Sequence, residues 1–184
     1  VIAALAKEGT PYRGILYGQF MLTSTGPKVI EFNARFGDPE AMNVLPLLKT
    51  PFPSVCEAIT NGRLAQMRVE FLEKASVCKY VVPSGYGEKP MADREIRVDE
   101  TAIRREGARA YYAAVNEVDG VITTTHSRAV GVVGIGANIA EAERRCEAAL
   151  KQVKGEAIYV RHDIGRPDIL RQKIDRQARI RGSP

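Results

Sequence analysis

The sequence predicts an α+β fold, in which an antiparallel hairpin and short helices precede a small mixed domain. Two runs rich in β-branched, aromatic and aliphatic residues flank a Thr-Gly-Pro turn within residues 12–40, which is typical of an antiparallel strand pair. Farther along, short apolar runs bounded by Gly, Pro and Asp alternate with helical patterns. We expect a domain boundary near Leu72, which divides the chain into residues 1–72 and 73–184.

The first part begins with the end of a helix. Gly9 suits the stop of a helix over residues 1–9, and the hairpin follows. Pro39 suits the first position of a helix that reaches about Leu48, with Glu40 near its positive end. A further helix is expected over residues 52–61, where Asn61-Gly62 is a typical ending. Residues 66–75 are expected to form a connector or an edge strand.

The second part is expected to be mainly strands. They are predicted within residues 75–82, 96–103, 108–118, 121–125, 127–136 and 157–160. An Asp-Gly pair at the tip of the 108–125 region indicates a tight hairpin turn, and we interpret the Gly- and Pro-rich stretch to Asp93 as a plain hairpin loop. The spacing of Gly131, Gly134 and Gly136 matches neither a dinucleotide nor a phosphate loop. It indicates a strand that bends and packs closely.

Helices complete the second part. Asn138 is a typical cap for a helix over residues 139–153, which Gly155 is expected to end. Its apolar stripe contains Cys146, so this thiol is expected in the core. Another helix is predicted from Arg166 to about Arg179. The sequence shows no set of partner residues around His126 or His162 that would support acid–base catalysis, so no such role is expected for them.

Bulk properties exclude several classes of protein. At 45% hydrophobic residues among 184, the chain can build real cores, which excludes global disorder. No apolar stretch approaches the roughly 20 residues of a membrane span. Three scattered cysteines indicate reduced thiols in the cytoplasm rather than a disulfide framework or zinc site. The first residues contain no initiator Met, basic leader or cleavage pattern, so we expect the sequence to begin mid-protein.

The net charge of +5 raises the question of a nucleic-acid partner. Much of the excess lies in residues 161–181, where charges of both signs follow a predicted helix and no aromatic residue follows Tyr159. This pattern is typical of a solvated helix face, so nucleic acid is not the expected partner.

One face of the hairpin is predicted to be polar. A turn at the Thr-Gly-Pro run pairs Gln19 with Glu31. Because side chains alternate along a strand, Glu31, Asn33 and Arg35 share this face with Tyr17 and Gln19.

The other hairpin face is predicted to be apolar, with Ile30, Phe32 and Ala34 directed toward a core.

The polar face has the chemistry of phosphoryl transfer. Carboxylate and amide oxygens suit hard cations such as Mg²⁺, whose other ligands are phosphates and water. An arginine two residues beyond Asn33 suits a transferring phosphate or an oxyanion, and phosphoryl transfer depends mainly on positioning and charge neutralisation. From the spacing alone, an exposed polar strand face explains these residues equally well.

Residues 29–40, Val-Ile-Glu-Phe-Asn-Ala-Arg-Phe-Gly-Asp-Pro-Glu, resemble the signature stretch of the glycinamide ribonucleotide synthetase family. These enzymes are ATP-grasp ligases of purine biosynthesis. The Glu-x-Asn-x-Arg core is shared across ATP-grasp enzymes, and the continuation through Asp38 and Glu40 is more specific to this family. Similar stretches follow the family's order at residues 14–17, 45–48, 80–86, 127–136 and 157–165. The resemblance covers nearly the whole chain and the C-terminal part of the family's protein.

The resemblance implies that residues 1–72 are the C-terminal part of an ATP-grasp domain and that the substrates are ATP, glycine and 5-phosphoribosylamine. Glu31 would bridge two ions, Mg²⁺ or Mn²⁺, with Gln19 holding one and Asn33 the other. Arg35 would steady phosphoryl oxygens, and Asp38 would contact the amino substrate. Gln19 departs from the glycine found in many members, and its neutral amide is a weaker ligand than the acid that other ATP-grasp enzymes use.

The resemblance also implies a missing partner. The family's N-terminal substrate domain, its glycine-rich loop and its ATP-gripping lysines correspond to sequence upstream of Val1, so the chain alone is expected to be inactive. Two alternatives stay open. One is an ATP-grasp ligase with another acid and amine, and the other is a basic, non-enzymatic module that binds RNA or a protein through its last helix.

Overall fold

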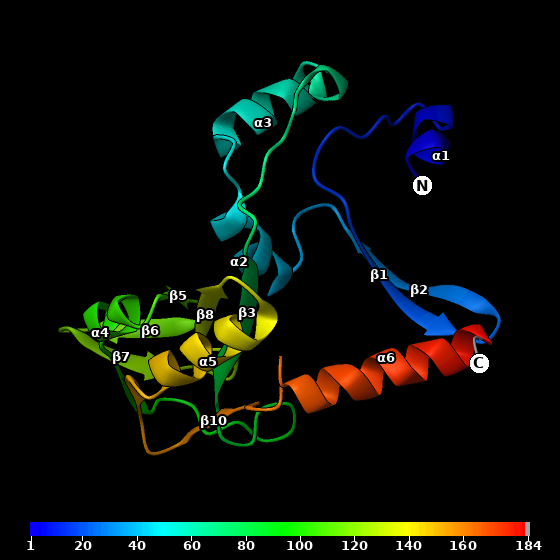
Figure 1. Ribbon diagram of the computed structural model, residues 1–184. Coiled ribbons are helices and arrows are strands. Elements are labelled where there is room, and N and C mark those ends of the chain that lie inside the picture. Colours follow the sequence, from blue (N-terminus) through cyan, green and yellow to red (C-terminus); the bar gives the residue numbers. More distant parts are fainter. Residues whose placement is uncertain (183–184) are drawn as a thin grey trace.

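The computed structural model describes residues 1–182 and confirms a mixed α+β architecture (Figure 1). The first part contains α1 Ile2–Lys7, β1 Tyr17–Thr23, β2 Gly26–Asn33, α2 Glu40–Val44, η1 Leu45–Leu47, α3 Phe52–Thr60 and η2 Leu64–Gln66. The second part contains β3 Ala75–Pro83, β4 Glu95–Val98, α4 Glu100–Arg105, β5 Ala108–Tyr112, β6 Val115–Val118, β7 Val121–Thr124, β8 Val130–Gly136, α5 Ile139–Leu150, β9 Val153–Lys154, β10 Ile158–Val160 and α6 Pro167–Arg181. None of the helices within residues 1–182 has the length and apolar character needed to cross a bilayer.

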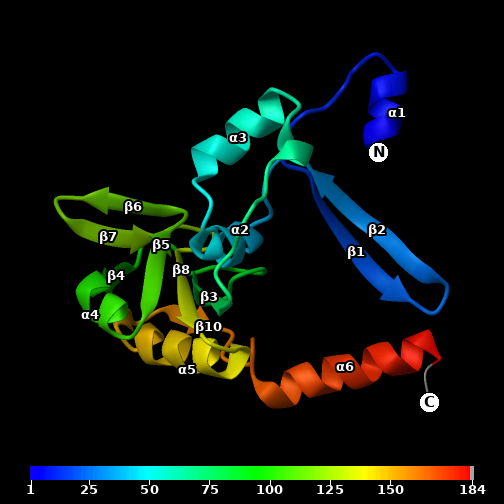
Figure 2. The same ribbon diagram turned by 45° about the horizontal axis from the view of Figure 1, so that its top comes forward.

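The strands form three antiparallel sheets. β1 and β2 form the hairpin, and two four-stranded sheets have the orders β10-β3-β8-β5 and β6-β7-β4-β9. The core lies between these two sheets and α5, and contains fully buried side chains such as Ile103, Val130 and Val132. The hairpin and α3 lie outside this core, and α6 extends from it to contact β1 (Figures 1 and 2).

Glycines let α5 pack closely on β8, as the sequence predicts. A Cβ at Gly134 would collide with the carbonyl oxygen of Ala142, and one at Gly136 would lie 2.6 Å from the Ala142 nitrogen. The helix begins at the predicted cap, where Asn138 Oδ1 accepts a hydrogen bond of 2.9 Å from the Glu141 amide. The lack of a Cβ at these two positions of β8 therefore sets the distance between the helix and the sheet.

The helix ends earlier than predicted. It stops at Leu150 rather than at Val153, because Val153 leaves the helical path and pairs with Val98 in β4. The prediction also missed a helix, α4, which directly follows β4. Residues expected to carry one strand, 96–103, contain β4 and then α4, which Asp99 Oδ1 caps by accepting from the Ala102 amide at 2.9 Å.

Two further strand predictions are corrected. The loop up to Asp93 is not a hairpin loop, because β3 and β4, which it joins, belong to different sheets. The strand expected over residues 108–118 is divided into β5, which pairs with β8, and β6, which pairs with β7. The tight turn between β6 and β7 is confirmed, with positive φ values of 51° at Asp119 and 77° at Gly120.

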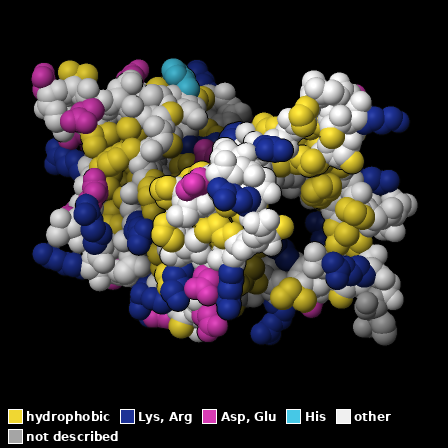
Figure 3. Space-filling model, turned by 90° about the horizontal axis from the view of Figure 1, so that it is seen from above, with side chains coloured by type: hydrophobic (Ala, Val, Ile, Leu, Met, Phe, Trp, Pro, Cys, Tyr) yellow, Lys and Arg dark blue, Asp and Glu magenta, His cyan; other side chains and the backbone are white. Residues whose placement is uncertain are grey.

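The apolar side of the hairpin does not face a core within the described residues. Ile30 is 51% exposed and Phe32 is 41% exposed, and Ala34 is exposed as well, so that prediction is wrong here. Phe32 packs edge-on against Phe20 at a centroid distance of 5.9 Å, but no second layer of residues 1–182 covers this face. Apolar side chains also reach the surface elsewhere, as the space-filling view from above shows (Figure 3).

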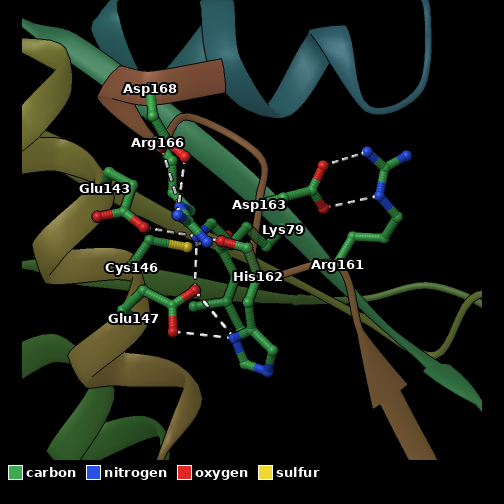
Figure 4. A network of polar contacts seen from close by, with 10 residues as sticks. Lys79, Glu143, Cys146, Glu147, Arg161, His162, Asp163, Arg166 and Asp168 are labelled. Atoms are coloured by element: carbon green, nitrogen blue, oxygen red, sulfur yellow. Dashed lines mark hydrogen bonds and ion pairs between the residues drawn. The ribbon is translucent and has the colours of Figure 1, made fainter. Parts of the chain in front are cut away.

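A buried lysine joins three segments of the second part (Figure 4). Lys79 on β3 is fully buried, and its Nζ donates to Glu143 Oε1 at 2.8 Å, Glu147 Oε1 at 2.5 Å and the His162 carbonyl at 2.9 Å. His162 Nδ1 lies 2.9 Å from Glu147 Oε2, so this histidine has a partner that the sequence did not reveal. The lysine therefore ties α5 and the segment leading into α6 to the central sheet.

Candidate active site

The register of the hairpin gathers the predicted polar residues. The pair next to the turn is Thr23 with Gly26, which alone would place Gln19 opposite Ile30, and a register shift between Gln19 and Phe20 restores the predicted pairs. Gln19 lies opposite Glu31 and Tyr17 lies opposite Asn33. All four line one pocket of about 500 Å³ together with Arg35. The turn over residues 36–41 and the side chain of Arg128 complete its wall. The face predicted from strand periodicity is therefore one side of a real pocket.

The donor set consists of one carboxylate and two amides. Asn33 Nδ2 donates to Glu31 Oε1 at 2.9 Å, which holds these side chains together at the mouth of the hairpin. Within residues 1–182, no three His, Cys, Asp or Glu side chains gather into a metal-binding cluster. A cation here would take one carboxylate and amide oxygens from this chain and the remaining ligands from phosphates and water. This ligand set fits Mg²⁺, which is usually bound by one or two carboxylates plus substrate phosphates.

Arg35 presents its guanidinium to the same pocket. Its Nη1 donates to the carbonyl of the neighbouring Phe36 at 2.6 Å, which bends the side chain along the pocket wall. A guanidinium has five N–H donors in a planar fork, so this one bond leaves donors for an anion. The arrangement suits a phosphoryl or carboxylate group placed between Arg35 and the Glu31 side of the pocket.

Glu40 lies near the positive end of a helix, as the sequence predicts. It lies in the first turn of α2, where negative charge is stabilising, and its Oε1 accepts a hydrogen bond of 2.9 Å from Tyr17 Oη. This hydrogen bond raises the pKa of the Tyr17 phenol above its ordinary value. A Cβ at Gly37 would collide with Glu40 Oε2, so the glycine gives Glu40 room to fold back toward the hairpin.

Asp38 is held by two residues that sequence reasoning missed. Tyr80 Oη donates to Asp38 Oδ1 at 2.7 Å, and Arg128 Nη2 lies 3.0 Å from Asp38 Oδ2. Arg128 Nη1 also donates to the Asp38 carbonyl at 3.1 Å. These partners lie 42 and 90 residues away along the chain, so no local spacing could have shown them. Both belong to the second part of the chain, which therefore forms part of the pocket.

Two family models match the chain. The model described as phosphoribosylglycinamide synthetase, C domain, matches residues 76–167. The model described as phosphoribosylglycinamide synthetase, ATP-grasp (A) domain, matches residues 1–41. The polar hairpin face thus lies within the ATP-grasp match, and Tyr80 and Arg128 lie within the C-domain match.

Individual relatives give the same result. The chain is 53% identical to a phosphoribosylamine–glycine ligase of Methanocaldococcus jannaschii over 98% of its length, and 53% identical to one of Methanobrevibacter smithii over 97%. It spans about 40% of the length of these curated relatives. The crystal structure of a phosphoribosylamine–glycine ligase from Thermotoga maritima superposes with a TM-score of 0.72 at 28% identity, covering 88% of this chain and 39% of the other.

Proposed function

Because the chain belongs to the phosphoribosylglycinamide synthetase family, we propose that it is the C-terminal portion of an ATP-dependent ligase for glycine and 5-phosphoribosylamine. The products are glycinamide ribonucleotide, ADP and phosphate, which places the reaction in purine biosynthesis. The observation that carries this proposal is the pocket lined side by side by Glu31, Asn33 and Arg35. The identity of about 50% to phosphoribosylamine–glycine ligases supports the choice of substrates.

The polar hairpin face would hold the divalent cations. Glu31 would be the carboxylate ligand for Mg²⁺ or Mn²⁺, shared between two ions, and Gln19 and Asn33 would each supply an amide oxygen. When bound, such ions neutralise charge on the phosphates of ATP. The contribution of this chain is to fix the spacing of the oxygen ligands, because Gln19 and Glu31 are paired directly across the two strands.

Arg35 would act on the group being transferred. A carboxylate oxygen of glycine attacks the γ-phosphorus of ATP, ADP leaves, and glycyl phosphate forms. The amine of 5-phosphoribosylamine then attacks the acyl carbon, the bond from that carbon to the phosphate oxygen breaks, and phosphate leaves with the proton that the nitrogen gives up. The guanidinium of Arg35 stabilises the phosphoryl oxygens through both steps, since planar, charged donors match that group. Asp38, which lines the same pocket, would contact the amino substrate.

The remaining parts of the proposal concern the rest of the protein. We place the domain boundary near Leu72, which is supported by the family matches on either side of it. The ATP-gripping residues and the N-terminal substrate domain lie in a preceding portion of the same protein. A cytoplasmic location fits the three free cysteines, Cys56, Cys78 and Cys146.

A substrate panel tests the proposed reaction. ADP release is measured with the chain extended upstream to its natural start, in the presence of 5-phosphoribosylamine and one amino acid at a time. We expect release with glycine and at least tenfold less with alanine, serine or β-alanine. Omission of 5-phosphoribosylamine serves as the control for uncoupled ATP hydrolysis. Faster release with another acid, or with another amine, would assign the pocket to a different ATP-grasp ligase.

A further inference from the structure

Three contacts fix Asp38 from two directions. Tyr80 Oη donates to one carboxylate oxygen at 2.7 Å, Arg128 Nη2 approaches the other at 3.0 Å, and Arg128 Nη1 donates to the main-chain carbonyl at 3.1 Å. Arg128 also lies 4.9 Å above the Tyr80 ring centre, where a guanidinium is attracted to the aromatic face. The side chain and the backbone of Asp38 are therefore held together, which a single surface ion pair would not achieve.

The backbone that carries Tyr80 and Arg128 is held by hydrogen bonds in the central sheet. Arg128 lies just before β8, and the backbone around it is bonded on both sides: Ala114 N donates to the Arg128 carbonyl at 2.9 Å, and Ala129 N donates to the Val81 carbonyl at 3.0 Å. Ala129 is fully buried. Tyr80 lies in the middle of β3, opposite Gly131 of β8. Both donors thus start from paired backbone in the central sheet of the second part.

The segment that follows Asp38 is attached to the same sheet. Met42 of α2 packs on β8 where Gly131 leaves room, since a Cβ there would lie 2.7 Å from Met42 Sδ. One residue farther, Asn43 Nδ2 donates to Ser76 Oγ at 3.0 Å, and Ser76 Oγ donates to the Asn43 carbonyl at 2.9 Å. Asp38 is therefore held in place by contacts with the second part of the chain, whereas Glu31 and Asn33 lie in the hairpin.

Tyr80 stays a hydrogen-bond donor under ordinary conditions. Burial and the hydrogen bond to Asp38 raise the pKa of its phenol well above the usual range, so the hydroxyl keeps its proton. Because Tyr80 and Arg128 occupy one direction around each carboxylate oxygen, the remaining lone pairs of Asp38, which is 44% exposed, are available to the pocket.

The pocket is chemically two-sided. Arg35 and the cation ligands suit the phosphates and the reacting carboxylate, whereas Asp38, in the same lining, keeps carboxylate oxygens partly exposed for a positive group. An amino acid substrate carries a negative carboxylate and a positive ammonium group, so it matches this polarity. Building on the proposed function, we propose that Arg128 and Tyr80 are positioning residues that aim Asp38 at the ammonium group of the amino acid substrate.

Steady-state kinetics on the chain extended to its natural start test this assignment. Tyr80→Phe removes the hydroxyl alone, and Arg128→Met removes the fork while keeping an unbranched side chain. Each should raise the KM for glycine about tenfold, with the KM for ATP changed by less than about twofold. Arg128→Lys should recover part of the loss, because it keeps the charge without the bidentate geometry.

Arg166→Met is the matched control. Arg166 makes a similar fork with Asp168, at 3.1 and 2.8 Å, away from the pocket lining, so its loss should leave both KM values unchanged.

Two results would overturn the inference. An unchanged glycine KM in Tyr80→Phe and Arg128→Met, with an active wild type, would show that the contacts do not serve the amino acid. Equal rises in the KM for glycine and ATP, with a lower melting temperature, would show that they merely join the two parts. A wild-type enzyme without glycine-dependent turnover would remove the proposed function as well, so the two failures are distinguishable.

Discussion

At the residue scale, Gln19 shows how the pairing of two strands brings two potential cation ligands together. Gln19 lies directly opposite Glu31, where a second carboxylate would add a stronger ligand for a hard cation. The period of two predicted the face, but the turn alone does not set this pair, because a register shift between Gln19 and Phe20 is what brings Glu31 opposite Gln19. Tyr80 and Arg128 could not be predicted, because they meet Asp38 only after β3 and β8 have paired and α2 has packed against them.

Gln19→Glu should strengthen cation binding. In the enzyme extended to its natural start, we expect the Mg²⁺ concentration for half-maximal rate to fall about fivefold, because a charged ligand replaces a neutral one. Without the cation, the introduced carboxylate should repel Glu31 across the strand pair and cost about 0.5 kcal/mol of stability. Melting curves of the present chain with and without Mg²⁺ measure this. A Mg²⁺ requirement that stays the same or rises would argue against Gln19 as a ligand.

At the element scale, local signals compete with pairing between distant segments. The cap of α5 was predictable from Asn138, but its end was not, because Val153 pairs with Val98 of β4. α4 was missed although Asp99 caps it and Gly107 follows it, since its apolar residues are few and its sequence also fits a short strand. The contacts of Lys79 likewise join segments 64 to 83 residues apart, beyond the reach of any local pattern.

Lys79→Met should destabilise the second part by about 3 kcal/mol, because Glu143 and Glu147 would keep their charges without a buried partner. Chemical denaturation of the present chain, followed by circular dichroism, measures the free energy of unfolding. Lys89→Met, at an exposed loop position, is the control and should change it by less than about 0.5 kcal/mol. A similar small change for Lys79→Met would show that the buried network contributes nothing to stability.

Acid should destabilise the network around Lys79, because it protonates the Glu147 carboxylate. Burial raises the pKa of this carboxyl, but hydrogen bonds from Lys79 and His162 lower it more, leaving it below its ordinary value of 4.5. A depressed pKa gives stability that is complete above 4.5 and is lost as the pH falls through the folded-state value. The difference in unfolding free energy between wild type and Glu147→Gln should therefore narrow in acid.

Denaturation at pH values from about 7 to about 3 measures that difference. Glu88→Gln, in an exposed loop, is the control and should follow the wild type throughout. If the difference in unfolding free energy widened in acid, the pKa of Glu147 would be raised in the folded protein rather than lowered, and the prediction would be wrong.

At the scale of the whole molecule, the pocket combines residues from two distant stretches of the chain. The hairpin carries Gln19, Glu31 and Asn33, whereas the central sheet fixes Asp38 through Tyr80 and Arg128. The chain spans about 40% of its relatives' length, and the apolar hairpin face, including Phe20 and Ile30, is exposed within the described residues. The sheet orders and this exposure depend on long-range assembly, so residue periodicity could not predict them.

We predict that the chain by itself releases no ADP in response to glycine, because it holds the cation ligands and Asp38 while the proposed ATP-gripping residues lie in the preceding portion. An assay of the purified chain with ATP, Mg²⁺, glycine and 5-phosphoribosylamine measures this. The extended enzyme at the same concentration is the positive control. Glycine-dependent ADP release by the chain alone would refute the prediction.

The most direct test of the proposed site is the rate of glycine-dependent ADP release by the extended enzyme carrying Glu31→Ala. We predict a loss of at least about a hundredfold relative to wild type, because the carboxylate proposed to bridge the cations is removed. Glu117→Ala, at an exposed position of β6, should retain the wild-type rate. Turnover that is indifferent to Glu31 would leave the family assignment in place and would contradict the assignment of the reaction to the polar face of the hairpin.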